Sequence, residues 1–184
     1  MKTLLTENGL PIRFGFFIFD RWSTHVIGNS LAKQKKFENL LNLYISTKTF
    51  EECCCMSLSR TRLMCYDLDA HNDTMAKTLE ERKTALLATL KKIGVTPALE
   101  KSGRGYHVWL VFNHVPNAQQ RAQIHTYVEK IVPNIEGASF DEKYCIRLPG
   151  LYKNTKTYGI DADTNTYLVN CEFVKTFFEK RILF

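Results

Sequence analysis

Alternating apolar and polar positions divide the chain into segments with strand periodicity. Arg62 to Asp69 and Tyr106 to Phe112 contain apolar runs with aromatic residues, and they predict two buried strands. Phe16 to Phe19 predicts a buried strand near the N-terminus, and Leu43 to Phe50 predicts another. Further extended segments are expected at 96–100 and 144–148, with a short hairpin formed by 158–160 and 166–169.

Helical spacing of apolar residues predicts the helices. Asn72 and Asp73 are good capping residues, and after them leucines recur at helical spacing up to Gly94. Asn117 begins a second helix, whose predicted apolar face carries Ile124, Tyr127, Val128 and Ile131. Two more helices are expected over 33–43 and 171–180. Strands and helices intermix, so the sequence predicts a mixed α+β or α/β domain.

The length of 184 residues favours one domain, which we expect to span residues 1–184. No apolar run approaches the roughly 20 residues that cross a bilayer, so no membrane partner is expected. The first six residues turn polar too quickly to form a signal peptide. A cytoplasmic protein is therefore the expectation.

Composition adds a preference for anionic partners. The formal net charge is +6, and a basic surface attracts phosphates, although many basic proteins bind nothing specific. Of the six cysteines, Cys53, Cys54 and Cys55 are consecutive, and the chain has no C-x-x-C pair. This spacing does not suit a tetrahedral zinc site, and a disulfide framework is not expected without a secretory signal, so reduced thiols are expected.

Two carboxylates stand at the end of the strand that begins at Arg62. Residues i and i+2 of a strand share a face, so Asp67 and Asp69 project together while Tyr66 and Leu68 face the other side. Such a pair repels unless a cation lies between, and Mg²⁺ or Mn²⁺ prefers these oxygen ligands. The alternative is a solvated strand end before a helix cap, and the spacing alone leaves both interpretations open.

A glycine turn leads into the strand that begins at Tyr106. In the run Ser102–His107 two glycines flank Arg104, and exposed amides of such a turn can cradle phosphate oxygens. The next strand then presents His107, Trp109 and Val111 on one face. The alternative is a hairpin turn followed by a core histidine with satisfied hydrogen bonds. This is no P-loop, because no G-K-[ST] follows.

A third polar element follows the second predicted helix. Asp141 stands after an apolar residue, and Arg147, Lys153 and Lys156 follow it. One more carboxylate would complete a two-metal site, and the basic side chains would offset the charge of a triphosphate or a template backbone. The alternative is a polar surface loop.

Taken in order, these elements resemble the archaeo-eukaryotic primase superfamily, in particular its primase-polymerase branch from plasmids, phages and CRISPR-associated genes. The run Asp67-Leu-Asp69 resembles the family's acidic motif, Ser102–His107 its serine-to-histidine motif, and Phe140-Asp141 its third motif. The run Arg147–Lys156 resembles an R-L-P-G stretch of several members. The resemblance covers roughly residues 37–160.

The resemblance implies a primase-polymerase catalytic core, with an RRM-like sheet packed with helices beside a smaller N-terminal αβ unit. The implied activity is DNA primase or DNA polymerase, which transfers nucleotides to a 3′-hydroxyl or starts primers on single-stranded DNA. Two divalent ions, Mg²⁺ or Mn²⁺, would be held by Asp67, Asp69 and Asp141. The nucleotide would be contacted by Ser102, Gly103, Arg104, Gly105, His107, Arg147 and Lys156.

The chain also departs from the family pattern. Leu151 stands where threonine is common, and two extra residues precede Lys156. No helicase or zinc-binding module is visible, so a minimal catalytic protein and the core of a larger one both fit, with a helicase or other replication protein acting in trans. Two rival functions remain: a non-catalytic module that binds single-stranded nucleic acid, and a metal-dependent nuclease or phosphohydrolase.

Overall fold

The computed structural model describes most of the central chain. The described residues are 13–18, 21–26, 30–33, 35–36, 39, 49–50, 53–70, 72–102, 105–133, 135–137, 145–153 and 167–169. They form small antiparallel sheets and helices, which confirms the mixed α+β class.

One sheet carries both long helices. The chain order is β5 (Leu63–Leu68), α3 (Asp73–Lys92), β6 (Ala98–Lys101), β7 (Tyr106–Val111), α4 (Ala118–Glu129) and β8 (Glu136–Gly137), and the strand order is β6-β7-β5-β8. All three pairings are antiparallel. Each helix therefore connects two strands that have a third strand between them, so the sheet consists of two interleaved split β–α–β units.

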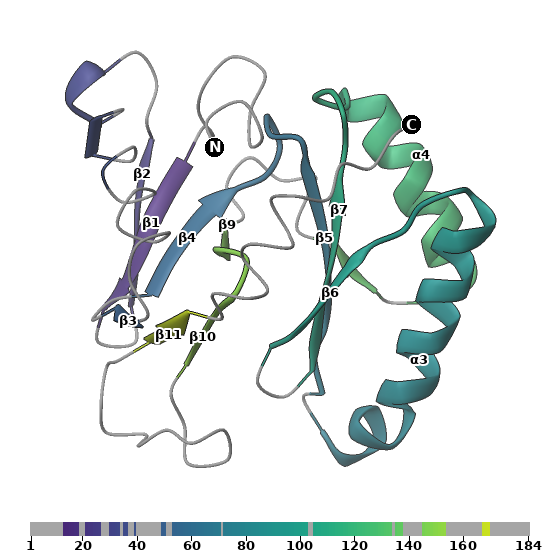
Figure 1. The fold of residues 1–184 in the computed structure, drawn as a ribbon. Coiled ribbons are helices and arrows are strands. Elements are labelled where there is room, and N and C mark those ends of the chain that lie inside the picture. The colour runs from purple at the N-terminus through teal and green to yellow at the C-terminus, as the bar shows by residue number, and fades with distance from the viewer. Residues whose placement is uncertain are drawn as a thin grey trace.

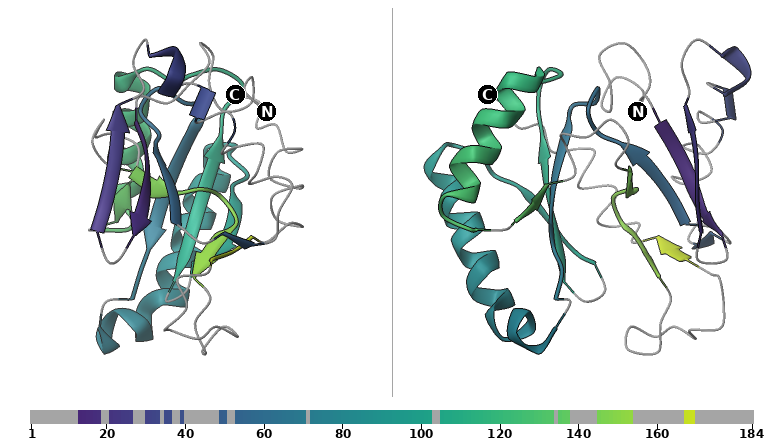
Figure 2. Two further views of the ribbon diagram at one scale, coloured as in Figure 1. Left: turned by 90° about the vertical axis from the view of Figure 1, so that its left-hand side faces the viewer. Right: turned by 180° about the vertical axis from the view of Figure 1, so that it is seen from behind.

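The remaining strands lie on the other side of this sheet from the helices (Figure 1 and both views of Figure 2). One group has the order β2-β1-β4-β9, and the other has the order β10-β11-β3. Their bounds are β1 (Arg13–Ile18), β2 (Arg21–Val26), β3 (Thr49–Phe50), β4 (Cys53–Ser57), β9 (Cys145–Arg147), β10 (Leu151–Lys153) and β11 (Tyr167–Val169).

Side-chain caps define where both long helices begin. Asn72 accepts a hydrogen bond from the Met75 amide at 2.9 Å, so it is the cap of α3, whereas Asp73 lies in the first turn. Of the two residues expected to cap this helix, Asn72 is confirmed and Asp73 is wrong, although an acid in the first turn still suits the helix dipole. Asn117 forms a reciprocal capping box with Gln120. Gly94, at φ 79°, follows the end of α3 as predicted.

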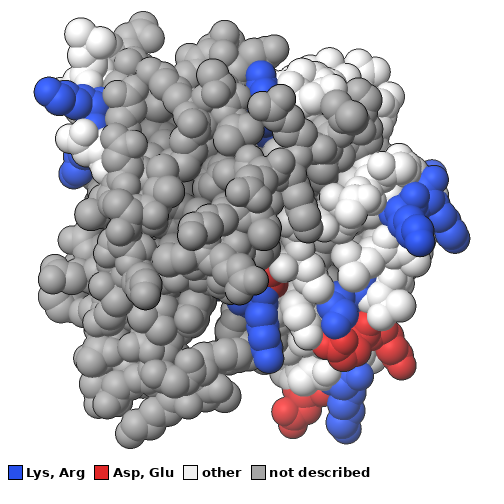
Figure 3. All heavy atoms as spheres, viewed as in Figure 1, with Lys and Arg blue, Asp and Glu red and all other residues white. Residues whose placement is uncertain are grey.

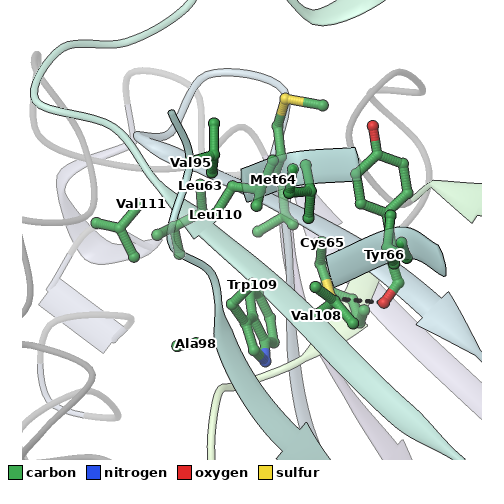
Figure 4. Packing of buried hydrophobic residues seen from close by; sticks show 14 of the residues in the cluster. Leu63, Met64, Cys65, Tyr66, Val95, Ala98, Val108, Trp109, Leu110 and Val111 are labelled. Carbon is green, nitrogen blue, oxygen red and sulfur yellow. Dashed lines mark hydrogen bonds between the residues drawn. The ribbon is translucent and has the colours of Figure 1, made fainter. Parts of the chain in front are cut away.

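The β6-β7-β5-β8 sheet has two different faces. Tyr66 of β5 stacks on His125 of α4 with ring centroids 6.1 Å apart, and the Tyr106 hydroxyl of β7 donates to Glu80 of α3 at 2.7 Å. These even-numbered residues therefore face the helices, and their position opposite the face of Asp67 and His107 is the one that the alternation predicted. Figure 4 shows the buried side chains packed around β5 and β7, including Leu63, Met64, Val108, Trp109 and Leu110.

A buried arginine joins α4 to the connection between β4 and β5. Arg121 is 2% exposed and donates through Nε to Pro116 O at 3.1 Å and through Nη1 to Leu63 O at 2.8 Å. Its Nη2 donates to the carbonyl of Thr61. Burial lowers the pKa of Arg121 to about 10, so the guanidinium stays charged at neutral pH.

Some element predictions need correction. Tyr127 and Ile131, expected on the buried face of α4, are exposed, and the buried residues of that helix are Arg121 and Val128. Strand β11 pairs with β10 and β3, so it does not form the predicted local hairpin within the described residues.

Around residue 35 the described backbone is helical, as predicted. The predictions for 41–48, 158–160 and 171–180 lie outside the described residues.

Among the residues that the structure describes, no helix is long and apolar enough to cross a membrane.

We expect Arg121→Met to lower the free energy of unfolding by about 3 kcal/mol, because buried carbonyl oxygens would lose a charged donor. Chemical denaturation followed by circular dichroism measures this change. Lys77→Met removes an exposed positive charge from α3 and is the control, with an expected change within about 0.5 kcal/mol. Equal effects of the two substitutions would contradict the anchoring role of Arg121.

Candidate functional site

The first predicted carboxylate lies opposite the predicted histidine. In the β5–β7 pairing Asp67 is the partner of His107, and the distance from Asp67 Oδ1 to His107 Nε2 is 3.8 Å. The Asp67 side chain is 22% exposed and that of His107 only 3%, so a solute reaches the carboxylate before it reaches the ring. Asp69 is half-buried, lies just beyond the end of β5 and accepts from the Ala70 amide at 2.8 Å.

A second carboxylate, which sequence reasoning missed, lies on the other side of the histidine. Glu100 of β6 is the cross-strand partner of His107 and is 5% exposed. Its Oε2 lies 3.3 Å from His107 Nδ1 and accepts from Trp109 Nε1 at 2.7 Å. Its Oε1 accepts from the Gly150 amide at 2.8 Å. Glu100, His107 and Asp67 therefore form one row across β6, β7 and β5.

The predicted glycine turn joins β6 to β7 as a hairpin. The Ser102 amide donates to the Gly105 carbonyl at 2.9 Å, which closes the turn. A Cβ on Gly105 would overlap the carbonyl oxygen of Leu68 and lie 3.0 Å from Asp69 Cα. The glycine is thus required because the hairpin backbone lies directly against the end of β5, where the two acids stand.

The predicted R-L-P-G stretch contacts the same hairpin. Arg147, at the end of β9, lies with its Nη2 3.5 Å from the Ser102 carbonyl oxygen. Gly150, at φ 85°, lies in the following turn and donates to Glu100. Residues far apart in the sequence therefore meet beside Asp67 and His107, and Arg147 brings a positive charge to this place.

A buried thiol lies next to the acids on β5. Cys65 is fully buried, and this burial raises the pKa of its thiol well above the ordinary value. The carboxylates of Asp67 and Glu100 act in the same direction, while Arg147 opposes them. Cys65 is therefore a neutral thiol at physiological pH, and it serves as packing beneath the site rather than as a nucleophile.

The helix-covered side of the hairpin carries an exposed charged cluster. Lys83 of α3 lies 4.4 Å from the centre of the Tyr106 ring and pairs with Glu80. Hydrogen bonds from Lys83 and then Tyr106 lower the pKa of Glu80. Figure 3 shows basic and acidic side chains intermixed at the lower right, where α3 begins. The cluster is thus a local support for α3 on β7, and it is not a basic surface.

The structure brings together Asp67, Ser102, Gly105, His107 and Arg147 of the predicted site residues, with Asp69 adjacent in the chain. Gly103, Arg104, Asp141 and Lys156 lie outside the described residues. Glu100 had one available signal: it stands two residues before Ser102 on the same strand face. That signal was weak, because a glutamate that is exposed on an edge strand would stand at the same spacing from Ser102.

No protein-family model matches the chain, and no curated protein matches it either. The resemblance to primase-polymerases therefore stays a prediction that depends on the order of the motifs.

We expect Gly105→Ala to lower the free energy of unfolding by about 3 kcal/mol, because the new methyl group would overlap backbone that cannot move aside. Gly94→Ala is the matched control. Its new methyl group would face open space, so the expected loss is only the cost of a left-handed backbone conformation, about 1 kcal/mol. Thermal or denaturant unfolding measures both values. Equal losses would show that the hairpin does not need its close approach to β5.

We expect the stability of the protein to fall as pH rises above about 9, in part because of Cys65. A raised folded-state pKa contributes stability below the unfolded pKa, and this contribution is lost as pH rises towards the folded value. Cys65→Ala should make the decline of the free energy of unfolding with pH shallower, by up to about 1.4 kcal/mol per pH unit. Val108→Ala removes buried volume but no titrating group, and it should keep the wild-type slope. Identical slopes in all three proteins would contradict the prediction.

Proposed function

We propose that this protein is a metal-dependent nucleotidyltransferase of the primase-polymerase type. It joins nucleotides to a 3′-hydroxyl or starts a primer on single-stranded DNA. The observation that carries the proposal is the cross-strand pair of Asp67 and His107, with Arg147 and the Ser102–Gly105 hairpin beside it. These groups come from the acidic motif, the serine-to-histidine motif and the R-L-P-G stretch, in the order that the family resemblance requires.

The sheet topology supports the same proposal. The order β–α–β–β–α–β with the strand arrangement β6-β7-β5-β8 is that of an RRM-like sheet, and the other strands would correspond to the smaller unit of a primase-polymerase core. Asp67 lies on the central strand β5, paired with β7 on one side and β8 on the other, and Asp69 follows just beyond the strand. A carboxylate between two neighbouring strands is held in place, which suits a site that needs fixed geometry.

The donor set fits divalent metal ions. Asp67 and Asp69 offer hard oxygen ligands, and both side chains are reachable because neither is fully buried. Asp141 would be the third ligand. Bound Mg²⁺ or Mn²⁺ would activate the attacking hydroxyl and offset the charge of the triphosphate and the departing pyrophosphate.

The chain's own residues would bind and orient the nucleotide. Arg147 lies with its guanidinium beside the hairpin, where it would add positive charge next to the acids. By the family resemblance, the Ser102–Gly105 turn would contact phosphate oxygens, which is an electrostatic contribution. His107 lies behind Asp67 and would support this arrangement from the buried side. Single-stranded DNA and nucleoside triphosphates are the proposed partners.

Labelled nucleotide incorporation on a single-stranded DNA template tests the proposal, with Mg²⁺ or Mn²⁺ and with or without a primer. We expect Asp67→Asn combined with Asp69→Asn to reduce incorporation at least about a hundredfold, because the metal ligands would be lost. Asp73→Asn is the matched control, since it removes an exposed carboxylate from the first turn of α3. That variant should retain activity.

Each alternative gives a distinct result in this assay. Incorporation that survives the double substitution would contradict the assignment of the acids. Degradation of DNA or nucleotides without added triphosphate would indicate a nuclease or phosphohydrolase that uses water as the nucleophile. Binding of single strands that needs no metal, without incorporation, would indicate a non-catalytic module, and its affinity should fall steeply with salt.

A further inference from the structure

We infer that Glu100 is a positioning residue, which fixes the orientation of His107 and fastens the Arg147–Gly150 turn to the same hairpin. The carboxylate of Glu100 contacts three groups from two parts of the chain. Two of them, the indole of Trp109 and the imidazole of His107, come from β7. The third, the amide of Gly150, comes from the turn after β9.

The chemistry of these partners explains why a carboxylate stands here. The Trp109 indole and the Gly150 amide are donors only, so both oxygens of Glu100 must accept. A buried carboxylate is costly without such donors, and here it has them at 2.7 and 2.8 Å. His107 Nδ1 faces the same acceptor-only group, so Nδ1 carries the hydrogen.

This arrangement determines which edge of the ring faces the acids. With Nδ1–H held by Glu100, the Nε2 edge is directed to Asp67, 3.8 Å away. The ring also meets Trp109 edge to face, with centroids 5.9 Å apart and an interplanar angle of 89°, which restricts its rotation. Glu100 thus acts on the site through His107, which lies between it and Asp67 in the row across the strands.

The contact to Gly150 couples a second element to the same carboxylate. The Gly150 amide is held by Oε1, and Arg147, three residues earlier, contacts the Ser102 carbonyl. Loss of Glu100 would therefore release the ring and the turn together. The consequence for nucleotide binding rests on the proposed function, whereas the consequence for the ring and the turn does not.

A nitrogen–proton correlation spectrum of the histidine rings tests the inference on the full chain at one pH. We expect wild-type His107 to show a protected Nδ1–H signal, assigned by its loss in His107→Asn. Glu100→Met keeps the side-chain length without an acceptor and should remove that signal. It should also speed hydrogen exchange at the Gly150 amide. Glu81→Met, on the exposed surface of α3, is the control and should leave both signals unchanged.

Two results would overturn the inference: a wild-type His107 with its hydrogen only on Nε2, or a Nδ1–H signal that survives Glu100→Met. The first result is measured on the wild-type protein alone, so it tests the inference even if Glu100→Met fails to fold.

Nucleotide incorporation then separates positioning from a folding defect. We expect Glu100→Met to raise the KM for dATP about tenfold while kcat changes little, as for other supporting residues behind a site. Partial unfolding would instead lower kcat and leave KM unchanged, and that result would contradict the positioning role. A wild type that shows the ring signal but incorporates no nucleotide would refute the proposed function and leave the role of Glu100 intact.

Discussion

The register between β5 and β7 is the constraint on which the rest of the site depends. It sets Asp67 opposite His107, and β6 adds Glu100 to the same row. Because side chains alternate along a strand, a slip of a single residue would turn Asp67 towards the helices and Tyr66 into the site. The stacking of Tyr66 on His125 and the hydrogen bond from Tyr106 to Glu80 on the helix side oppose such a slip, so contacts on one face determine the chemistry on the other.

Polar contacts also join segments that lie far apart in the sequence. Arg121 holds the connection between β4 and β5 from the helix side, and Glu100 holds the turn after β9 from the other side. Both are buried charged groups: Arg121 donates to backbone carbonyls, whereas Glu100 contacts two side chains of β7 and the backbone amide of Gly150. Both groups therefore limit the relative movement of β5, β7 and the R-L-P-G stretch. Fixed geometry of this kind is what a site needs when it must orient charged ligands.

Local patterns were sufficient to predict the elements around the site. The strands β5 and β7, their two faces and the beginnings of α3 and α4 follow from alternation and capping residues, which act over a few neighbouring positions. Sheet order and pairing partners depend on contacts between distant residues, so the pairing of β11 with β10 and β3 was not predictable from a local hairpin pattern. The exposure of Tyr127 has the same origin, because helical spacing shows a face but not what covers it.

The candidate site shows the same division between local and distant information. Asp67 and Gly105 were recognisable from spacing, whereas Glu100 was not, because its partner Gly150 is distant in the sequence. Of the two interpretations of His107, the structure bears on the core histidine, and contact with a phosphate stays a prediction. Its Nδ1 edge has the satisfied contact of a core histidine, and its Nε2 edge faces a candidate metal ligand. A histidine that is held firmly on its buried side can present its other side with little loss of conformational entropy, which is what a supporting residue behind a carboxylate requires.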